Sequence, residues 1–137
     1  QGGAVKFLDS NIILRYLTGD DARKAQRCQA LFERAERGQE SLYTTALAIA
    51  EVVWVLASRY RHPKTKVVEG IRRLLNTRNI LVEEPEVLLQ ALYLFERHPI
   101  DFIDAYHGAI IQARGLAEVY SYDSDFDQLP GLTRIEP

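Results

Sequence analysis

Several features are missing from this sequence of 137 residues, and each absence excludes a class of protein. Cysteine occurs once, as Cys28, so neither an intramolecular disulfide nor a thiolate metal cage can form. A chain of this length buries enough surface to fold without disulfides, which favours a reducing, cytoplasmic compartment. The sequence also has no run of about 18 apolar residues and no secretion-signal pattern. We therefore expect a soluble protein that does not contact a membrane.

The chain also lacks a large net charge. It carries 17 Lys and Arg against 19 Asp and Glu, a net charge of −2, which excludes a uniformly basic nucleic-acid binder but not a local basic surface. Its length and its hydrophobic content of 47% predict one globular domain. Methionine is absent as well, so we expect Gln1, Gly2 and Gly3 to come from outside the natural protein, and the domain to span residues 4–137.

Short β-type runs alternate with helical patterns along the sequence. We expect strands at residues 4–8, 42–43, 80–82, 118–122 and 133–135. We expect helices at residues 12–17, 20–37, 46–59, 64–76, 85–97 and 101–115. No hairpin signal of the Asn-Gly type joins two strands. Strands separated by helices predict an α/β fold in which helices cover a parallel sheet.

Two carboxylates in the first half of the chain are candidate functional groups. Asp9 directly follows the first expected strand, at the end where open parallel sheets bind ligands, although helix N-capping explains this residue equally well. Glu51 is the only charge in residues 46–57, a segment that is apolar almost all round and that we expect to be buried. A buried carboxylate needs a cation, a hydrogen-bonding partner or a raised pKa. A salt bridge to an Arg elsewhere is the alternative explanation.

Two further carboxylates share one face of a helix in the second half of the chain. Asp101 and Asp104 are three residues apart, and Gly108 follows one turn later, where the missing side chain is expected to leave space above Asp104. Capping and the helix dipole explain both acids as well. Of the two, Asp104 is the stronger functional candidate.

A third acidic segment follows the strand expected at residues 118–122. Asp123 directly follows this strand, as Asp9 directly follows the first. Asp125 and Asp127 come two and four residues later, and a solvated acidic turn is the alternative explanation for these two. The spacing excludes a calcium-binding loop, because Gln128 and Arg134 stand where that loop needs Gly and Glu.

Ligands that offer only oxygen suit a hard cation, Mg²⁺ or Mn²⁺, and argue against zinc. Carboxylates that converge on one pocket repel one another unless a cation neutralises them. We therefore expect metal to stabilise the fold, and some of these groups to titrate above their usual range without it. Neither a G-x-G-x-x-G nor a Walker A pattern is present, which leaves dinucleotide and P-loop phosphate sites unsupported.

Four of these acids and their neighbours resemble the acidic signature of the PIN domain. They are Asp9 in FLDSNIIL, Glu51 in AEVVWVL, Asp104 in DFIDAYHGA and Asp123 in SYDSDFDQLPG. Their order and the chain length are similar to those of VapC-type toxin ribonucleases of bacterial and archaeal toxin–antitoxin pairs. The resemblance covers nearly the whole chain. It implies a three-layer α/β fold with a central parallel sheet of about five strands flanked by helices.

The resemblance also implies a function, namely metal-dependent hydrolysis of RNA by in-line attack of water, with Mg²⁺ as the cofactor and Mn²⁺ as a substitute. Asp9, Asp104 and Asp123 would be direct ligands, and Glu51 either a ligand or the group that orients the attacking water. The part played by Asp101 and Asp125, which only some members carry, stays open. A homodimer and a cognate antitoxin that blocks the site are implied as well.

An RNA substrate needs cations to hold it. Residues 59–78 contain seven Lys and Arg and one Glu, a net charge of +6. A solvated helical surface is one interpretation, and contacts with phosphates that weaken steeply with salt are the other. The candidate RNA-binding residues are Arg15, Arg59, Arg61, Lys64 and Lys66.

Two other classes of function remain as alternatives. A phosphoacceptor signalling domain also has an Asp after its first strand, but it needs a neighbouring acid and a Lys after the last strand, and neither is present. The other alternative is a catalytically silent PIN-fold binding module. Retention of all four acids favours the enzyme over both.

Overall fold

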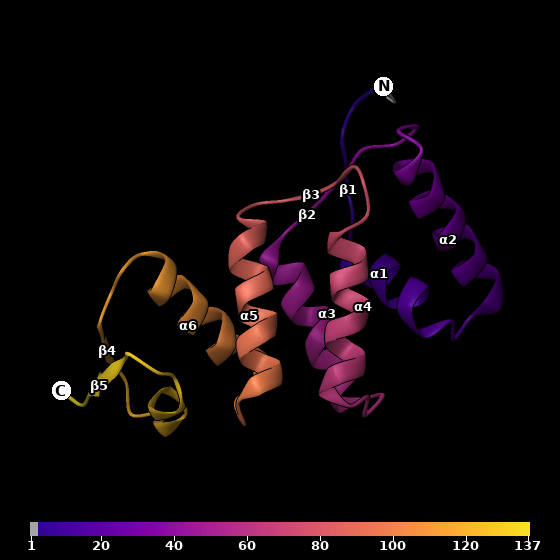
Figure 1. Cartoon of the computed structure of the whole chain (residues 1–137). Coiled ribbons are helices and arrows are strands. Elements are labelled where there is room, and N and C mark those ends of the chain that lie inside the picture. Colours follow the sequence, from indigo (N-terminus) through magenta and orange to yellow (C-terminus); the bar gives the residue numbers. More distant parts are fainter. Residues whose placement is uncertain (1–2) are drawn as a thin grey trace. The chain divides into compact units, whose positions relative to one another are not determined.

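A computed structural model describes residues 3–137; Gln1 and Gly2, two of the three residues excluded from the expected domain, lie outside the described residues. The chain divides into two compact units, Gln1–Glu83 and Glu84–Pro137, whose α-helices and strands are labelled in Figure 1.

The first unit contains four helices and a three-stranded sheet. Its elements are β1 (Lys6–Phe7), α1 (Ser10–Thr18), α2 (Ala22–Glu36), β2 (Leu42–Thr44), α3 (Ala46–Ser58), α4 (Lys64–Leu75) and β3 (Ile80–Val82). The strand order is β1-β2-β3, and both pairings are parallel, with Phe7 opposite Tyr43 and Tyr43 opposite Leu81. The helices connect these strands as crossovers, as parallel pairing requires.

Two helices of this unit begin directly after parallel strands. Asp9 caps α1 by accepting a hydrogen bond from the Asn11 N–H at 3.5 Å, and Thr45 caps α3 by accepting one from the Ala48 N–H at 3.1 Å. The buried Thr44 hydroxyl donates to the Leu8 carbonyl at 2.9 Å, which ties the end of β2 to the end of β1. The N-termini of α1 and α3 therefore lie at the same edge of the sheet, the edge at which parallel sheets bind ligands.

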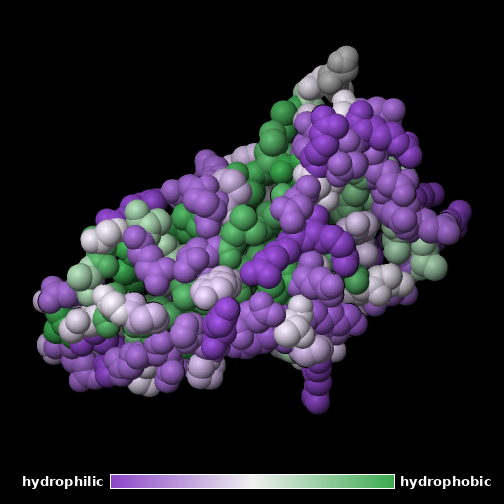
Figure 2. Space-filling view, in the orientation of Figure 1, coloured by the Kyte–Doolittle hydropathy of each residue, from purple (hydrophilic) through white to green (hydrophobic). Residues whose placement is uncertain are grey.

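β1, one of the two outer strands of this sheet, has an apolar edge. Within residues 3–137, β1 pairs with β2 only, and both Phe7 of β1 and the neighbouring Val5 are exposed. Figure 2 shows hydrophobic surface close to the grey N-terminal residues. An exposed apolar edge strand can accept a further strand, because its backbone groups on that side are unpaired.

The second unit contains two packed helices and a two-stranded sheet. Its elements are α5 (Pro85–Arg97), α6 (Phe102–Ala113), β4 (Glu118–Tyr120), the 3₁₀ helix η1 (Ser124–Gln128) and β5 (Thr133–Ile135). The Phe95 ring of α5 meets the Phe102 ring of α6 edge to face, with ring centroids 5.8 Å apart. β4 and β5 pair in parallel, so η1 and its flanking turns form the crossover that lies beside α6.

The expected elements are confirmed at nearly all their positions, and every described strand pairing is parallel, so the α/β fold class is confirmed. The strands form one sheet of three and one of two, whereas the family resemblance implies a single central sheet. Strands of two or three residues make few ladder hydrogen bonds, and in the described residues these bonds are made within each unit. No helix in residues 3–137 has the length and apolar character needed to cross a bilayer.

Candidate metal centre

The first functional side chain, Asp104, is positioned by the start of α6. Asp101 is the N-cap of this helix, and its carboxylate accepts a hydrogen bond from the Asp104 N–H at 2.9 Å. This cap fixes the first turn, and Asp104 at its third position faces the partial positive charge of the helix N-terminus. Asp101 thus serves as the expected cap, while the Asp104 side chain remains available to other groups.

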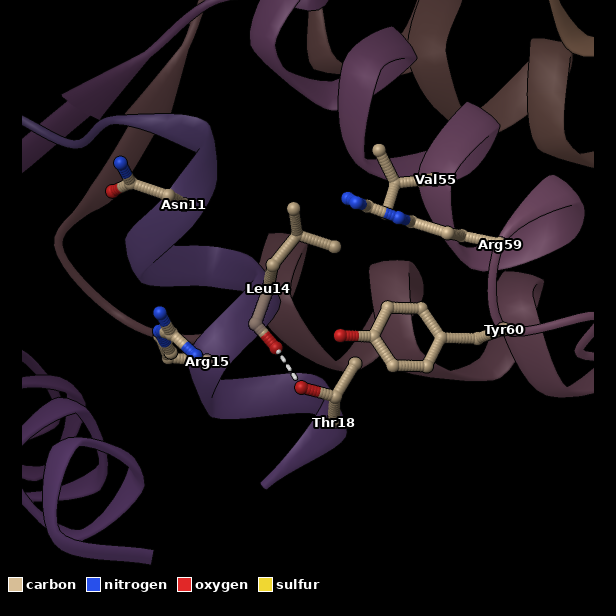
Figure 3. A pocket seen from close by; sticks show the side chains of 7 residues that line it. All are labelled: Asn11, Leu14, Arg15, Thr18, Val55, Arg59 and Tyr60. Carbon is tan, nitrogen blue, oxygen red and sulfur yellow. Dashed lines mark hydrogen bonds between the residues drawn. The ribbon is translucent and has the colours of Figure 1, made fainter. Parts of the chain in front are cut away.

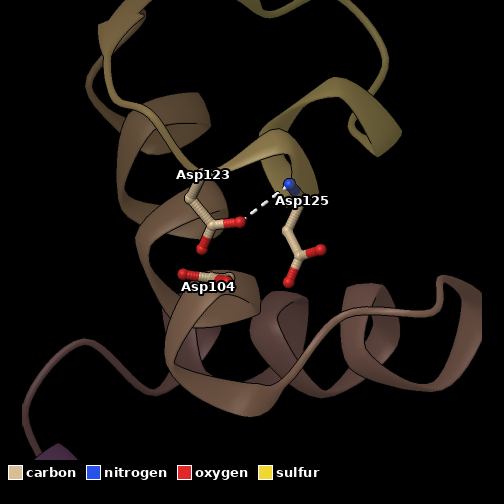
Figure 4. Close-up of side chains that lie close together, drawn as sticks. All are labelled: Asp104, Asp123 and Asp125. Atoms are coloured by element: carbon tan, nitrogen blue, oxygen red, sulfur yellow. Dashed lines mark hydrogen bonds between the residues drawn. The ribbon is translucent and has the colours of Figure 1, made fainter.

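The turn after β4 positions two further carboxylates. The Asp123 N–H donates to the Ser121 Oγ at 2.9 Å, and the Asp123 carboxylate accepts from the Asp125 N–H at 2.9 Å, which caps η1. These two bonds give the turn a defined shape. They place Asp123 and Asp125 over α6, and Figure 4 shows both side chains reaching toward Asp104.

The carboxylates of Asp104, Asp123 and Asp125 form a cluster, called the acidic cluster below. Each offers one oxygen, and these three oxygens all lie within 4.8 Å of one another. Burial raises the pKa of Asp104 to about 7, and hydrogen bonding to Asp123 and the nearby charges of Asp101 and Asp123 act in the same direction. Three such groups cannot all be ionised at close range without a cation, so in its absence Asp104 retains a proton at mildly acidic pH.

This donor set fits a divalent cation. Its three oxygens come from carboxylates alone, the ligands that Mg²⁺ and Mn²⁺ prefer. Among residues 3–137, it is the one group of at least three His, Cys, Asp or Glu side chains with ligand atoms so close together. The raised pKa of Asp104 also agrees with the expectation that some of these acids titrate high.

Asp127, from the same turn, has a different role. Arg134 of β5 donates to both of its carboxylate oxygens, at 3.0 and 3.2 Å, and also to the Ser121 carbonyl at 3.1 Å. These bonds lower the pKa of Asp127. Asp127 is exposed, as the solvated acidic turn predicts, and its bonds to Arg134 fasten η1 to β5. Asp125 is half-buried and belongs to the acidic cluster.

Gly108 does not leave the open space expected above Asp104. A Cβ at this position would lie 2.5 Å from the Leu129 Cδ1 and 3.5 Å from the Leu94 Cδ1. Leu129 is buried at the end of η1, and it fills the space that the glycine provides. The glycine is needed for close packing of α6 against η1, which keeps Asp123 and Asp125 near Asp104.

The two signature acids of the first unit, Asp9 and Glu51, are both exposed. Asp9 caps α1, and Glu51 lies on α3 between Leu47 and Trp54, which are 75% and 69% exposed. The expectation that Glu51 is buried was wrong, because only one stripe of this apolar helix is covered. That stripe consists of Ala48, Ile49, Val52, Val53 and Leu56. An exposed carboxylate needs no partner for its charge, so Glu51 is available to a ligand.

Two of the candidate RNA-binding residues, Arg15 of α1 and Arg59 at the end of α3, line one pocket of about 510 Å³. Figure 3 shows the Arg59 side chain reaching from α3 toward α1. The other residues that line this pocket are Asn11, Leu14, Thr18, Val55 and Tyr60, and the sequence alone did not identify them. Helical spacing could have indicated several of them, because Asn11 precedes Arg15, and Val55 precedes Arg59, by one turn. The other candidates, Arg61, Lys64 and Lys66, are outside this lining.

Comparisons with known proteins identify the family of the chain. The sequence matches the model of the PIN domain family over residues 6–132. It is 25% identical over 133 residues to a VapC ribonuclease of Aquifex aeolicus (strain VF5), which covers 97% of each chain.

Two solved structures are also similar to the chain. VapC20 of Mycobacterium tuberculosis, described as a toxin that cleaves the sarcin–ricin loop, has 21% identity and a TM-score of 0.40, with 98% of this chain and 100% of that one covered. VapBC2 of Rickettsia felis, bound to a DNA fragment from their promoter, has 12% identity and a TM-score of 0.39, with 97% and 98% covered. Since the family match includes both units and all four signature acids, the chain belongs to the PIN domain family.

Proposed function

We propose that this chain is a divalent-metal-dependent endoribonuclease of the VapC type, which hydrolyses RNA phosphodiester bonds as the toxin of a type II toxin–antitoxin system. The observation that carries the proposal is the acidic cluster of Asp104, Asp123 and Asp125 in a member of the PIN domain family. A curated relative that matches over almost its whole length is a VapC ribonuclease, which supports the reaction and its substrate class.

In this proposal the acidic cluster holds Mg²⁺, or Mn²⁺ in its place, with Asp104 and Asp123 as direct ligands. Asp125 supplies a third oxygen at the same place. The side chains of Asp101 and Ser121 accept hydrogen bonds from the backbone N–H groups of Asp104 and Asp123. They thereby fix the turns from which Asp104 and Asp123 project. A bound cation would offset the charge that develops on the phosphate and on the leaving oxygen.

The roles of Asp9 and Glu51 come from the sequence signature. We assign Asp9 as a further direct ligand and Glu51 as either a ligand or the group that orients the attacking water. Both side chains are exposed and carry no ion pair within residues 3–137. Neither role would therefore break an ion pair, although the Asp9 carboxylate also accepts the capping hydrogen bond from the Asn11 N–H.

Proton release accompanies metal binding in this proposal. Asp104, with its pKa raised to about 7, must lose its proton before its carboxylate can serve as a ligand. Metal affinity should consequently rise with pH up to about 7 and then level off. Below that pH, cation and proton compete for the same oxygens.

The sequence resemblance also leads us to propose a homodimer and a cognate antitoxin protein that blocks the site, in a cytoplasmic setting. The molar mass of the purified protein, measured by light scattering, tests the dimer against the 15.6 kDa of one chain. A mass of one chain at micromolar concentration would rule the dimer out.

The central test is cleavage of a mixed RNA pool with Mn²⁺. We expect the wild-type protein to cleave, EDTA to stop it, and Asp104→Asn or Asp9→Asn to lower the rate at least about 100-fold. Asp127→Asn is the matched control, since it removes an acid of the same turn that lies outside the acidic cluster.

The possible outcomes separate the enzyme from its alternatives. Undiminished cleavage by Asp104→Asn at the same Mn²⁺ concentration would refute the assigned site. A wild-type protein that binds Mn²⁺ through Asp104 but cleaves no RNA would favour the silent binding module.

A further inference from the structure

The pocket of about 510 Å³ in the first unit combines two cations with groups suited to a nucleotide. Arg15 and Arg59 supply two guanidinium groups, which match the oxygens of a phosphate. Asn11 supplies an amide, and Tyr60 supplies an aromatic ring, whose hydroxyl points toward α1 in Figure 3. A phosphate, a base edge and a base face are the three parts of a nucleotide that such groups recognise.

The two guanidinium groups are available to a ligand. Neither Arg15 nor Arg59 forms an ion pair with a carboxylate of residues 3–137. Asp20 accepts a hydrogen bond from the Tyr60 hydroxyl, and Asp21 caps α2 through the Lys24 N–H. The Lys24 N–H and, to a smaller degree, the charge of Arg15 lower the pKa of Asp21. An anion entering the pocket would therefore meet two guanidinium groups that have no ion pair within residues 3–137.

The pocket lies along the same two helices that carry the signature acids of the first unit. Arg15 follows Asp9 by six residues on α1, which is about 9 Å at a helical rise of 1.5 Å per residue. Arg59 follows Glu51 by eight residues along α3, which is about 12 Å. Both helices begin at the same edge of the sheet, so the acids lie nearer that edge and the arginines lie further along.

We propose that this pocket is a substrate subsite that binds one nucleotide of the RNA, with Arg15 and Arg59 on its phosphate and the Tyr60 ring beside its base. The inference rests on the proposed ribonuclease function and adds a position to it. With Asp9 and Glu51 in the proposed site, a separation of about 12 Å along α3 corresponds to about four nucleotides, on the scale of B-form DNA, whose strand advances about 3.4 Å per nucleotide. An acidic segment of a partner protein would use the cations but not the aromatic ring or the amide.

RNA binding in EDTA tests the subsite without any need for cleavage. We expect Arg15→Gln/Arg59→Gln to bind a fluorescein-labelled single-stranded RNA about 100-fold more weakly than wild type, at about tenfold for each arginine. The slope of log K against log salt should become shallower by about 0.7, since the two arginines neutralise one phosphate and each lost phosphate contact contributes about 0.7. Arg23→Gln/Arg37→Gln is the matched control, because it removes two charges from exposed positions at the two ends of α2, outside the pocket.

A second double variant separates recognition by the planar guanidinium group from the effect of positive charge alone. Arg15→Lys/Arg59→Lys keeps both charges but loses the planar fork, so it should retain the salt slope and lose part of the affinity. Thermal melts confirm that each variant is folded. Equal RNA affinity of wild type and the glutamine double variant would overturn the inference, as would a glutamine variant that loses affinity only for an acidic peptide.

The position of the subsite is tested with RNAs that carry one neutral methylphosphonate linkage at successive positions. One linkage within about four nucleotides of the cleaved bond should weaken binding to wild type and have no effect on the glutamine double variant. The same loss in both proteins at every position would contradict the inference. Absence of cleavage by wild type would instead refute the proposed function, so the two failures are distinguishable.

Discussion

The two units of the chain gather opposite charges. The first unit, residues 1–83, has 14 Lys and Arg against 9 Asp and Glu, for a net charge of +5. The second unit, residues 84–137, has 3 against 10, for a net charge of −7. The near-neutral total is thus the sum of a cationic unit and an anionic one. Such a distribution suits a protein that holds a divalent cation with one set of groups and nucleic-acid phosphates with another.

The units also differ in how their acids are held. In the second unit, an N-cap and a hydrogen-bonded turn bring three carboxylates to within 4.8 Å of one another. In the first unit, Asp9 and Glu51 are exposed on separate helices, and the gathered side chains are arginines. Convergence of like charges costs free energy, which the divalent cation that we propose for the acidic cluster would offset.

The largest expected effect comes from neutralising single acids of the second unit. We expect Asp123→Asn to lower Mn²⁺-dependent RNA cleavage about 1000-fold, since it removes a direct ligand. Asp125→Asn should lower it about 10–100-fold if Asp125 acts mainly by supporting the site. Rates measured on one RNA at saturating Mn²⁺ check both. Equal rates for wild type and Asp123→Asn would mean that the cluster has no part in the reaction.

The next effect comes from reversing charge in the first unit. Lys64→Glu/Lys66→Glu should weaken RNA binding about tenfold or more at moderate salt and flatten its salt dependence. Lys24→Glu/Arg27→Glu introduces the same charge on exposed positions of α2 and serves as the control. RNA affinities measured at several salt concentrations distinguish the two. If both double variants lose the same affinity, only net charge matters and the basic segment is not a binding surface.

A smaller effect is expected from filling the glycine positions of the two units. Gly108→Ala should lower the free energy of unfolding by about 1–2 kcal/mol, because the new Cβ would clash with buried Leu129. Gly70→Ala, also in a helix, should change it by less than about 1 kcal/mol, because its nearest neighbour is Leu17 at 3.3 Å and alanine favours helix. Chemical denaturation of both variants checks the order, and the reverse order would contradict it.

A further expected effect is the pH dependence of the metal-free protein. The folded-state pKa of Asp104, about 7, lies above its ordinary value of 3.8, so the folded state binds more protons between these values. This contribution to stability is complete below about pH 4 and is lost as pH rises through about 7. Unfolding in EDTA across this range should show the decline, and Asp104→Asn should reduce it. Identical pH profiles for the two proteins would remove Asp104 as the cause.

The elements of the fold were predictable because their signals are local. The cap at Asp9, the glycine at the end of α1 and the proline at the start of α5 each mark a helix boundary within a few residues of sequence. The two-residue and three-residue strands were recognised from apolar runs next to such boundaries. The division of these strands between two sheets depends on long-range pairing, which no local signal contains.

The site was predictable in part. Asp104 and Asp123 were identified from their places after a helix cap and a strand, but the addition of Asp125 depends on the hydrogen bonds of the turn at Ser121. The packing of Gly108 depends on Leu129, 21 residues later in the chain. The pocket at Arg15 and Arg59 likewise joins two helices that are far apart in sequence.

Thermal unfolding with and without metal tests the central claim most directly. With Mn²⁺ at about 100 times its Kd, the melting temperature of the wild-type protein should rise by about 10 °C relative to EDTA. Asp127→Asn should show the same rise, whereas Asp104→Asn should show almost none. Coincident wild-type melting curves in Mn²⁺ and EDTA would contradict a metal site at Asp104, Asp123 and Asp125.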